Sequence, residues 1–175
     1  MQIEIKPLGM IEAEAGAPLI AILREADREL AKAACAARVN GQLTDLRVPP
    51  QAGDVVEVLT FADADGRRAF RHTASHILAQ AVKRLFPAAK LAIGPAIEDG
   101  FYYDFEVEQP FSTEDLEKIE AEMKRIVKDN LPITRFSLPP AEAVAFYRER
   151  GESYKIELIE EHAGKGEPIS FYRQG

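Results

Sequence analysis

The order of apolar patterns in the first 60 residues constrains the fold of this chain more than any other feature. Apolar and polar residues alternate along Gln2–Lys6 and again along Met10–Glu14, as in half-buried strands. From Pro18 onward, apolar residues recur at helical spacing. An Asn40-Gly41 pair, which is typical of a tight hairpin turn, and an apolar run over Asp54–Thr60 complete the segment. The pattern predicts a strand hairpin, a helix, a second hairpin and a final strand.

This order predicts a small ubiquitin-like β-grasp domain over residues 1–61. Residues 62–68 are small or polar and include a glycine, so we expect a linker there. A larger α+β domain is expected over residues 69–175, which makes the whole chain α+β. Residues 152–161 fit either a strand or a helix. The other expected elements are helices over Ala69–Phe86, Ser112–Asn130 and Pro140–Arg150, and strands over Leu91–Ile93, Phe101–Val107, Ile133–Leu138 and Pro168–Arg173.

Helical spacing also predicts which side chains are buried in the two longer helices. At about 100° per residue, one face of the first helix is apolar and the opposite face is polar. The apolar face comprises Phe70, Ala74, Ile77, Leu78, Ala81 and Leu85, and the polar face His72, His76, Gln80 and Lys83. In the second helix, Ser112 and Asp115 predict a capping box, and Phe111 is placed to pack on Leu116. The expected buried stripe there is Leu116, Ile119, Met123, Ile126 and Val127.

Composition excludes several classes of protein. No apolar run approaches the roughly 20 residues of a membrane span, and the N-terminus has no signal-like apolar core, so we expect a cytoplasmic protein with no membrane partner. Cys35 is the single cysteine, which rules out an intrachain disulfide and a zinc site made of thiolates. A metal would need His, Asp or Glu ligands, and we assign no metal site.

Charge is unevenly distributed along the chain, although its net value is −7. Residues 61–91 carry six basic and two acidic side chains, whereas the segments on both sides are acidic. This basic segment is either a solvated helix surface or a local binding site for a phosphate backbone. The candidate contacts are Arg67, Arg68, Arg71, Lys83 and Arg84.

Two of the three histidines, His72 and His76, lie four residues apart within the first long helix. This spacing places them one turn apart on one face, where they can share a metal ion or a water molecule. The same spacing also occurs in solvated or hydrogen-bonded surface pairs. A zinc protease of the His-Glu-x-x-His type is excluded, because Thr73 follows His72 and no glutamate separates the histidines.

The sequence around the histidine pair resembles one enzyme family. Residues 71–87, Lys90–Pro95 and Glu98–Phe105 closely resemble the N-terminal half of bacterial threonyl-tRNA synthetases. Residues 1–60 resemble the small TGS module that precedes the editing domain in that family. The resemblance covers essentially the whole chain, since it continues through Phe111–Pro132, Gly151–Lys155 and Tyr172–Gly175.

The resemblance implies a contribution to hydrolytic editing of serine wrongly attached to tRNA(Thr). A synthetic site that selects threonine cannot fully reject a side chain one methyl smaller, because that methyl is worth only about 1–3 kcal/mol. His72 and His76 match the paired editing histidines and Lys155 the editing lysine, all three as catalytic residues. Gly94 and Tyr103 match residues that line the seryl pocket. The implied partner is the 3′ end of tRNA(Thr), which the basic residues above would contact.

The resemblance also implies what the rest of such a synthetase does. The family ligates threonine to tRNA(Thr) with ATP, Mg²⁺ and a zinc ion in a catalytic domain that this sequence does not match, and it dimerises through that domain. We therefore expect no cofactor in this chain and no ligase activity from it. The family pattern places an aspartate, a cysteine and a histidine of the editing pocket after the match to residues 172–175. The editing domain is accordingly expected to be incomplete at its C-terminus, which leaves the activity of the isolated chain open.

Two other functions fit the same residues. One is a zinc-dependent aminoacyl-tRNA hydrolase, because a related editing fold in alanyl-tRNA synthetase binds zinc through a similar histidine pair with Cys and His. The other is an RNA-binding or regulatory extension of a nucleotide-kinase fusion protein, in which TGS and editing-like domains also occur.

Overall fold

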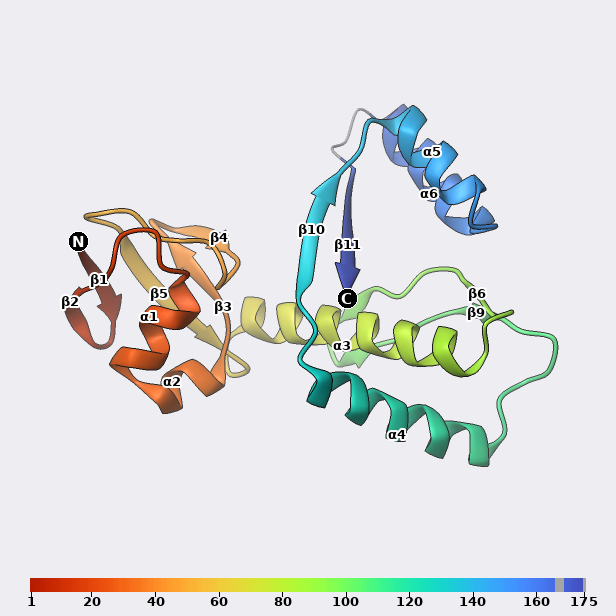
Figure 1. Cartoon of the computed structure of the whole chain (residues 1–175), viewed down its shortest axis with the longest axis horizontal. Helices are drawn as coiled ribbons and strands as arrows, with labels where there is room; N and C mark the ends of the chain where they lie inside the picture. Colours follow the sequence, from red (N-terminus) through yellow and green to blue (C-terminus); the bar gives the residue numbers. More distant parts are fainter. Residues whose placement is uncertain (166–168, 175) are drawn as a thin grey trace. The chain divides into compact units, whose positions relative to one another are not determined.

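The computed structural model describes residues 1–165 and 169–174. The chain divides into two compact units, Met1–Thr73 and Ala74–Gly175, and the division falls within one long helix (Figure 1). Within the described residues, no helix combines the length and the apolar character that a membrane span requires.

The N-terminal unit contains a five-stranded mixed sheet. In the sheet the strands follow the order β2-β1-β5-β3-β4. The central pair, β1 and β5, is parallel, and the other pairs are antiparallel. The strands are β1 (Gln2–Lys6), β2 (Gly9–Glu12), β3 (Ala34–Val39), β4 (Gln42–Thr44) and β5 (Val55–Thr60).

Helices α1 (Leu19–Ala26) and α2 (Arg28–Ala33) form where one helical pattern was expected. Asp27 divides them, because its backbone is extended and its carboxylate accepts hydrogen bonds from the N–H groups of Glu29 and Leu30. Apolar side chains from both helices pack against the inner face of the sheet. The buried cluster is Ile3, Ile5, Leu19, Ile22, Leu23, Ala31, Ala37 and Val56. The predicted β-grasp architecture is confirmed.

The predicted Asn-Gly turn joins β3 to β4. Asn40 and Gly41 both have positive φ, 51° and 83°, which Asn tolerates better than most residues and Gly adopts without steric cost. The Asn40 side chain also accepts a hydrogen bond from the N–H of Val55 (2.9 Å) and donates one to Asp54 (2.7 Å). The turn therefore ties the second hairpin to the start of β5.

Helix α3 (Ala64–Leu85) follows β5 almost directly. Residues 64–68 of the expected linker belong to this helix. The helix therefore begins five residues before the predicted start at Ala69. Two local features bring the helix this close to the strand. The Asp63 carboxylate accepts hydrogen bonds from the N–H and hydroxyl of Thr60. Gly66 lies so near the carbonyl oxygen of Thr60 that a Cβ at this position would be 1.9 Å from it.

In the C-terminal unit, α4 (Thr113–Asp129) shares a core with the second half of α3. Ser112 and Asp115 form the predicted capping box, and Asn130 ends the helix in the left-handed conformation. The buried cluster is Ala81, Val82, Ala89, Ile119 and Ile126, with Ile77, Leu78 and Met123 packed against it.

Four of the predicted core positions are wrong. Phe70, Leu85, Leu116 and Val127 are exposed. Leu116 and Val127 lie in the end turns of α4, and Leu85 is the last residue of α3. Phe70 lies in the N-terminal unit, where it packs edge to face on Phe61.

Short strands replace the long strand expected over Phe101–Val107. β6 (Lys90–Leu91) pairs with β9 (Phe105–Glu106), and β7 (Ala96–Ile97) pairs with β8 (Gly100–Phe101). Burial still alternates along residues 101–107 as predicted. Backbone hydrogen bonds between Asp104 and both Ala92 and Ile93 continue the β6–β9 ladder.

The remaining elements form an antiparallel strand pair capped by two helices (Figure 1). β10 (Ile133–Ser137) pairs with β11 (Ser170–Gln174), and between them come α5 (Pro140–Arg148) and α6 (Ser153–Gly164). The ambiguous residues 152–161 are therefore helical. The start of the expected strand at Pro168 lies outside the described residues.

Candidate active site

Helix α3 carries the histidine pair. His72 and His76 are four positions apart, so the two imidazoles are one helical turn apart. Partial desolvation, and then the positive charge of Arg68, lower the pKa of His72 from its usual 6.5. A histidine with a lowered pKa is neutral at pH 7, as a proton acceptor must be.

His76 is half-buried and contacts the strand pair. Its imidazole lies 5.4 Å, between ring centroids, from the ring of Tyr172 on β11. The strand pair thus places an aromatic side chain beside the second histidine, with the two rings tilted by 50°. Ser75, the residue just before His76, is fully buried, which fixes this stretch of α3 in the unit.

Gly94 and Tyr103, predicted to line one pocket, are in direct contact. A Cβ at Gly94 would be 2.1 Å from a ring carbon of Tyr103, so only glycine fits against this ring without displacement. The Tyr103 ring also stacks on the ring of Phe105, with 4.9 Å between the ring centroids. Burial, and then the charge of Glu152, raise the pKa of Tyr103 to about 12, so its hydroxyl remains protonated at neutral pH.

Lys155 lies in the first turn of α6. Its ammonium nitrogen is 5.0 Å from the centre of the Tyr147 ring on α5, within cation–π distance. Burial lowers the pKa of Lys155, the nearby Glu152 raises it, and the nearby Lys83 lowers it. The predicted catalytic lysine is therefore mostly enclosed by protein, and the charges of one carboxylate and a second ammonium act on it.

Glu152 is the functional candidate that sequence reasoning missed. It precedes α6, is only 8% exposed, and its Oε1 lies 3.3 Å from the ammonium of Lys83 on α3. Its charge also acts on Lys155, Tyr103 and Tyr147. An acidic residue before a helix is an ordinary sequence feature, so nothing in the sequence marked Glu152 as buried.

The structure thus connects most of the predicted site residues. Lys83 lies seven residues, or two turns, after His76 on the same polar face of α3. Glu152, which pairs with Lys83 on that face, also acts through its charge on Lys155 and on Tyr103. Within the C-terminal unit, the site therefore offers an imidazole, a buried lysine, a buried carboxylate and an aromatic wall.

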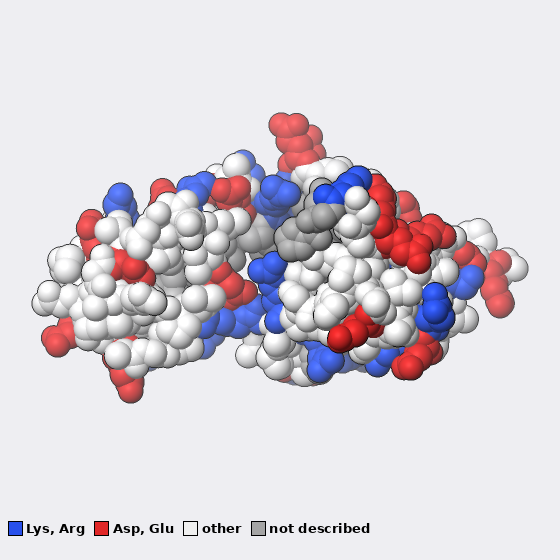
Figure 2. Space-filling view, turned by 90° about the horizontal axis from the view of Figure 1, so that it is seen from above, with Lys and Arg blue, Asp and Glu red and all other residues white. Residues whose placement is uncertain are grey.

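The five basic candidates have different surroundings. Lys83 and Arg84 form ion pairs inside the C-terminal unit, with Glu152 at 3.3 Å and Glu122 at 2.9 Å. Arg67 donates hydrogen bonds to the carbonyls of residues 61 and 62, and the Arg71 guanidinium lies 5.9 Å from the centre of the Phe61 ring. Arg68 is exposed. In the view of Figure 2, acidic and basic side chains both occur on each unit, and neither unit presents a continuous basic face.

Metal ligands do not gather in the part of the chain that the structure describes. Among residues 1–165 and 169–174, no group of three or more His, Cys, Asp and Glu side chains has the arrangement of a metal site. A tetrahedral zinc centre requires at least three protein ligands. The described histidine pair alone does not fit this requirement.

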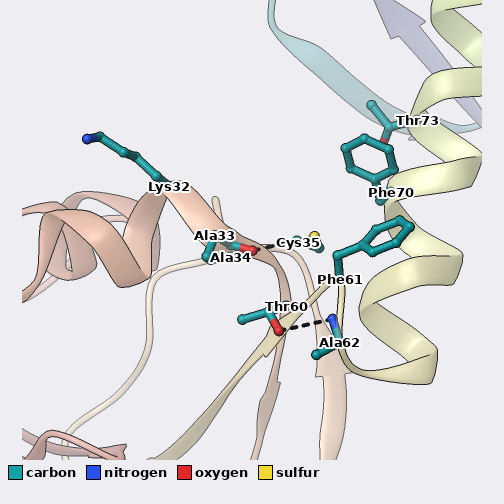
Figure 3. A pocket seen from close by; sticks show the side chains of 9 residues that line it. All are labelled: Lys32, Ala33, Ala34, Cys35, Thr60, Phe61, Ala62, Phe70 and Thr73. Atoms are coloured by element: carbon teal, nitrogen blue, oxygen red, sulfur yellow. Dashed lines mark hydrogen bonds between the residues drawn. The ribbon is translucent and has the colours of Figure 1, made fainter.

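A separate apolar hollow of about 820 Å³ lies in the N-terminal unit (Figure 3). It is lined mainly by the end of α2, the start of β3, the end of β5 and the first half of α3. Lys32, Phe61 and Phe70 contribute its largest side chains, and Cys35 also lines it. Burial, and then the charge of Asp63, raise the pKa of the Cys35 thiol, so the protonated, weakly nucleophilic form prevails at neutral pH. None of the predicted catalytic residues lines this hollow.

Comparison with known proteins identifies relatives along the whole chain. The family model of the TGS domain matches residues 25–60. The chain is 53% identical over 175 residues to the threonine–tRNA ligase of Acetivibrio thermocellus, a match that covers 100% of this chain and 27% of that protein. It is 50% identical over 175 residues to the threonine–tRNA ligase of Clostridium tetani, with the same coverage of 100% and 27%.

A third relative is the threonine–tRNA ligase of Carboxydothermus hydrogenoformans, which is 56% identical over 146 residues, 83% of this chain and 23% of that protein. The chain spans 27% or less of the length of these curated relatives. It therefore carries a TGS domain and is related along its whole length to the N-terminal region of the threonine–tRNA ligases.

Proposed function

We propose that this chain contributes to hydrolytic editing of serine misattached to tRNA(Thr), as part of a threonine–tRNA ligase. The observation that carries the proposal is the cluster in the C-terminal unit. Gly94 contacts Tyr103, and Glu152 connects Lys155 to the helix that bears the histidines. These residue types suit hydrolysis of an ester next to a small side chain.

The reaction is attack of water on the ester carbonyl that joins serine to the terminal ribose. The new C–O bond forms as the ester C–O bond to the ribose breaks, which gives free serine and a tRNA that ends in a hydroxyl. Neutral His72 or His76 accepts the proton of the attacking water and returns it to the leaving ribose oxygen. A positioned base of this kind contributes about 10²–10⁴-fold to a rate.

Lys155 and the Gly94–Tyr103 contact have different roles in this proposal. The Lys155 ammonium orients the water or stabilises the negative charge that develops on the ester oxygen. The Tyr103 ring, which leaves no room for a side chain at residue 94, sets the size of the pocket beside the amino acid. A pocket that fits serine and excludes the extra methyl of threonine would spare correctly charged tRNA.

The remaining activities belong to the whole ligase in our proposal. It ligates threonine to tRNA(Thr) with ATP and Mg²⁺, acts as a homodimer in the cytoplasm, and holds a zinc ion outside the residues described here. Of the basic residues, Arg67, Arg68 and Arg71 are our preferred contacts to tRNA, because Lys83 and Arg84 have acidic partners within the C-terminal unit.

The chain offers a matched pair of variants for the test. His76→Ala removes a proposed catalytic imidazole, and His162→Ala removes an exposed imidazole on α6. Hydrolysis of Ser-tRNA(Thr) should fall about 10²-fold or more in His76→Ala and stay unchanged in His162→Ala. Equal rates for both variants would refute the role of His76.

A further inference from the structure

Glu152 combines deep burial with an unused acceptor atom. The side chain is only 8% exposed, and its Oε2 atom is buried without a hydrogen-bond partner. Leaving a buried carboxylate oxygen unpaired costs free energy, so such an atom calls for an explanation. Glu152 lies directly before α6 and three residues before Lys155, so that lysine is a candidate partner for the unpaired oxygen.

The other oxygen of Glu152 is tied to α3. Lys83 lies 3.3 Å from Oε1 and also donates hydrogen bonds to the carbonyls of Ala89 (2.9 Å) and Pro87 (3.3 Å). Two of its three N–H donors are thus used in hydrogen bonds to the backbone, and the ion pair with Glu152 is a third contact. Lys83 is thereby held in one place, and it holds the carboxylate of Glu152 in turn.

Lys155 has the complementary property. Its side chain is mostly enclosed and lies over the Tyr147 ring at 5.0 Å, yet its ammonium makes no hydrogen bond to any residue in the described ranges 1–165 and 169–174. Within the described residues, the Lys155 ammonium therefore has N–H donors without an acceptor, and Glu152 Oε2 is an acceptor without a donor. The two residues are about one helical turn apart in the chain. The charge of Glu152 acts on Lys155, as does that of Lys83.

We propose that Glu152 is a positioning residue for Lys155. Its carboxylate is shared between Lys83 and Lys155, and it thereby fixes Lys155 relative to α3, the helix that carries the histidines. Glu152 keeps the Lys155 ammonium charged and directed while Lys83 anchors the carboxylate. The inference deepens the proposed editing function and rests on it only where Lys155 is said to act on an ester.

Titration of Lys155 tests the proposal without any need for activity. The Hε–Cε signals of a carbon-13 lysine-labelled chain are followed against pH, with Lys155 assigned by Lys155→Arg. The charged and titratable groups around this ammonium are Glu152 directly before its helix, Lys83 on α3 and Tyr147 on α5. Removal of the Glu152 charge and removal of the Lys83 charge should shift the Lys155 titration midpoint in opposite directions.

Glu152→Gln should move the Lys155 midpoint to lower pH, because the carboxylate that favours the charged lysine is lost. Lys83→Gln should move it to higher pH, because a repelling ammonium is lost. Glu160→Gln, which changes an exposed glutamate on the same helix, should leave the midpoint unchanged. A Glu152→Gln midpoint equal to that of Glu160→Gln would overturn the proposal. If Glu152→Gln does not fold, the absence of an upward shift in Lys83→Gln overturns it.

Activity then separates this proposal from the editing function. Glu152→Gln should lower kcat for Ser-tRNA(Thr) hydrolysis about 10-fold with little change in KM, since an orienting contact is lost and a binding contact is not. Glu152→Asp, which keeps the charge, should recover part of the rate. Predicted Lys155 shifts in a chain that hydrolyses no Ser-tRNA(Thr) would support the positioning role and refute the editing function.

Discussion

The ammonium of Lys83 lies 3.3 Å from Oε1 of Glu152, and this ion pair joins the polar face of α3 to the start of α6. His76 is two turns before Lys83, and Lys155 is one turn after Glu152. Glu152 is the buried partner, so loss of Lys83 would leave an uncompensated carboxylate. This ion pair therefore links the helix that carries the imidazole to the start of the helix that carries the ammonium, on both of which the proposed hydrolysis depends.

The contact between Gly94 and Tyr103 predicts a steric effect. In Gly94→Ala the new Cβ would be 2.1 Å from a ring carbon of Tyr103, so the buried ring must move. We expect a loss of about 1–3 kcal/mol in the free energy of unfolding, as is usual for overpacking, together with slower hydrolysis of Ser-tRNA(Thr). Denaturant unfolding measures the first effect. Gly100→Ala is the control, because a Cβ at Gly100 meets nothing within 4 Å; equal losses in both variants would contradict the steric account.

His72 should titrate below pH 6.5. Partial desolvation and the charge of Arg68 lower its pKa, so the neutral imidazole persists as the pH falls through 6.5. Removal of the positive charge in Arg68→Ala should shift the His72 titration midpoint to higher pH. If His72 is the base, the pH at which the hydrolysis rate falls on the acidic side should rise by the same amount. NMR titration of the imidazole signals tests the first statement. Arg28→Ala, a change at an exposed position, should leave the midpoint in place.

Glu122 should make stability depend on acid pH. Its carboxylate is buried on α4 and accepts a hydrogen bond from Arg84 (2.9 Å), and mainly for that reason its pKa lies below 4.5. Because the folded-state pKa is the lower one, the stabilisation is complete above pH 4.5 and is lost as the pH falls through the folded-state pKa.

Chemical unfolding at several pH values measures this dependence. Glu122→Gln should be less stable than wild type at pH 7, and the difference should shrink as the solution is acidified. Glu117→Gln, at an exposed position of the same helix, should differ little from wild type throughout. A difference for Glu122→Gln that stays constant from pH 7 to pH 3 would refute the role of the Arg84 pair.

Local signals in the sequence predicted the N-terminal unit well. Strand alternation in Gln2–Lys6 and the Asn40-Gly41 turn act over a few residues, and the sheet order follows from them together with the helical segment. The capping box of Ser112 and Asp115 was predictable for the same reason. The break at Asp27 was missed, although aspartate is a common N-cap, because the apolar pattern continues across it.

Contacts between distant residues were not predictable. Glu122 is buried within an otherwise polar stretch because Arg84, on another helix, pairs with it. Glu152 is buried because Lys83 and its neighbours surround it, and Lys83 had been expected to face solvent or RNA. The Gly94–Tyr103 contact follows from tertiary packing, so the sequence alone offered only the family resemblance as a reason to pair them.

Selectivity between two aminoacyl-tRNAs tests the central claim most directly. The hydrolysis rates of Ser-tRNA(Thr) and Thr-tRNA(Thr) are measured side by side with the 175-residue chain. We predict faster hydrolysis of the seryl ester by about 10-fold or more, the discrimination that one methyl group provides. Equal rates for the two esters, or rates no higher than in buffer alone, would contradict the proposal that this chain edits.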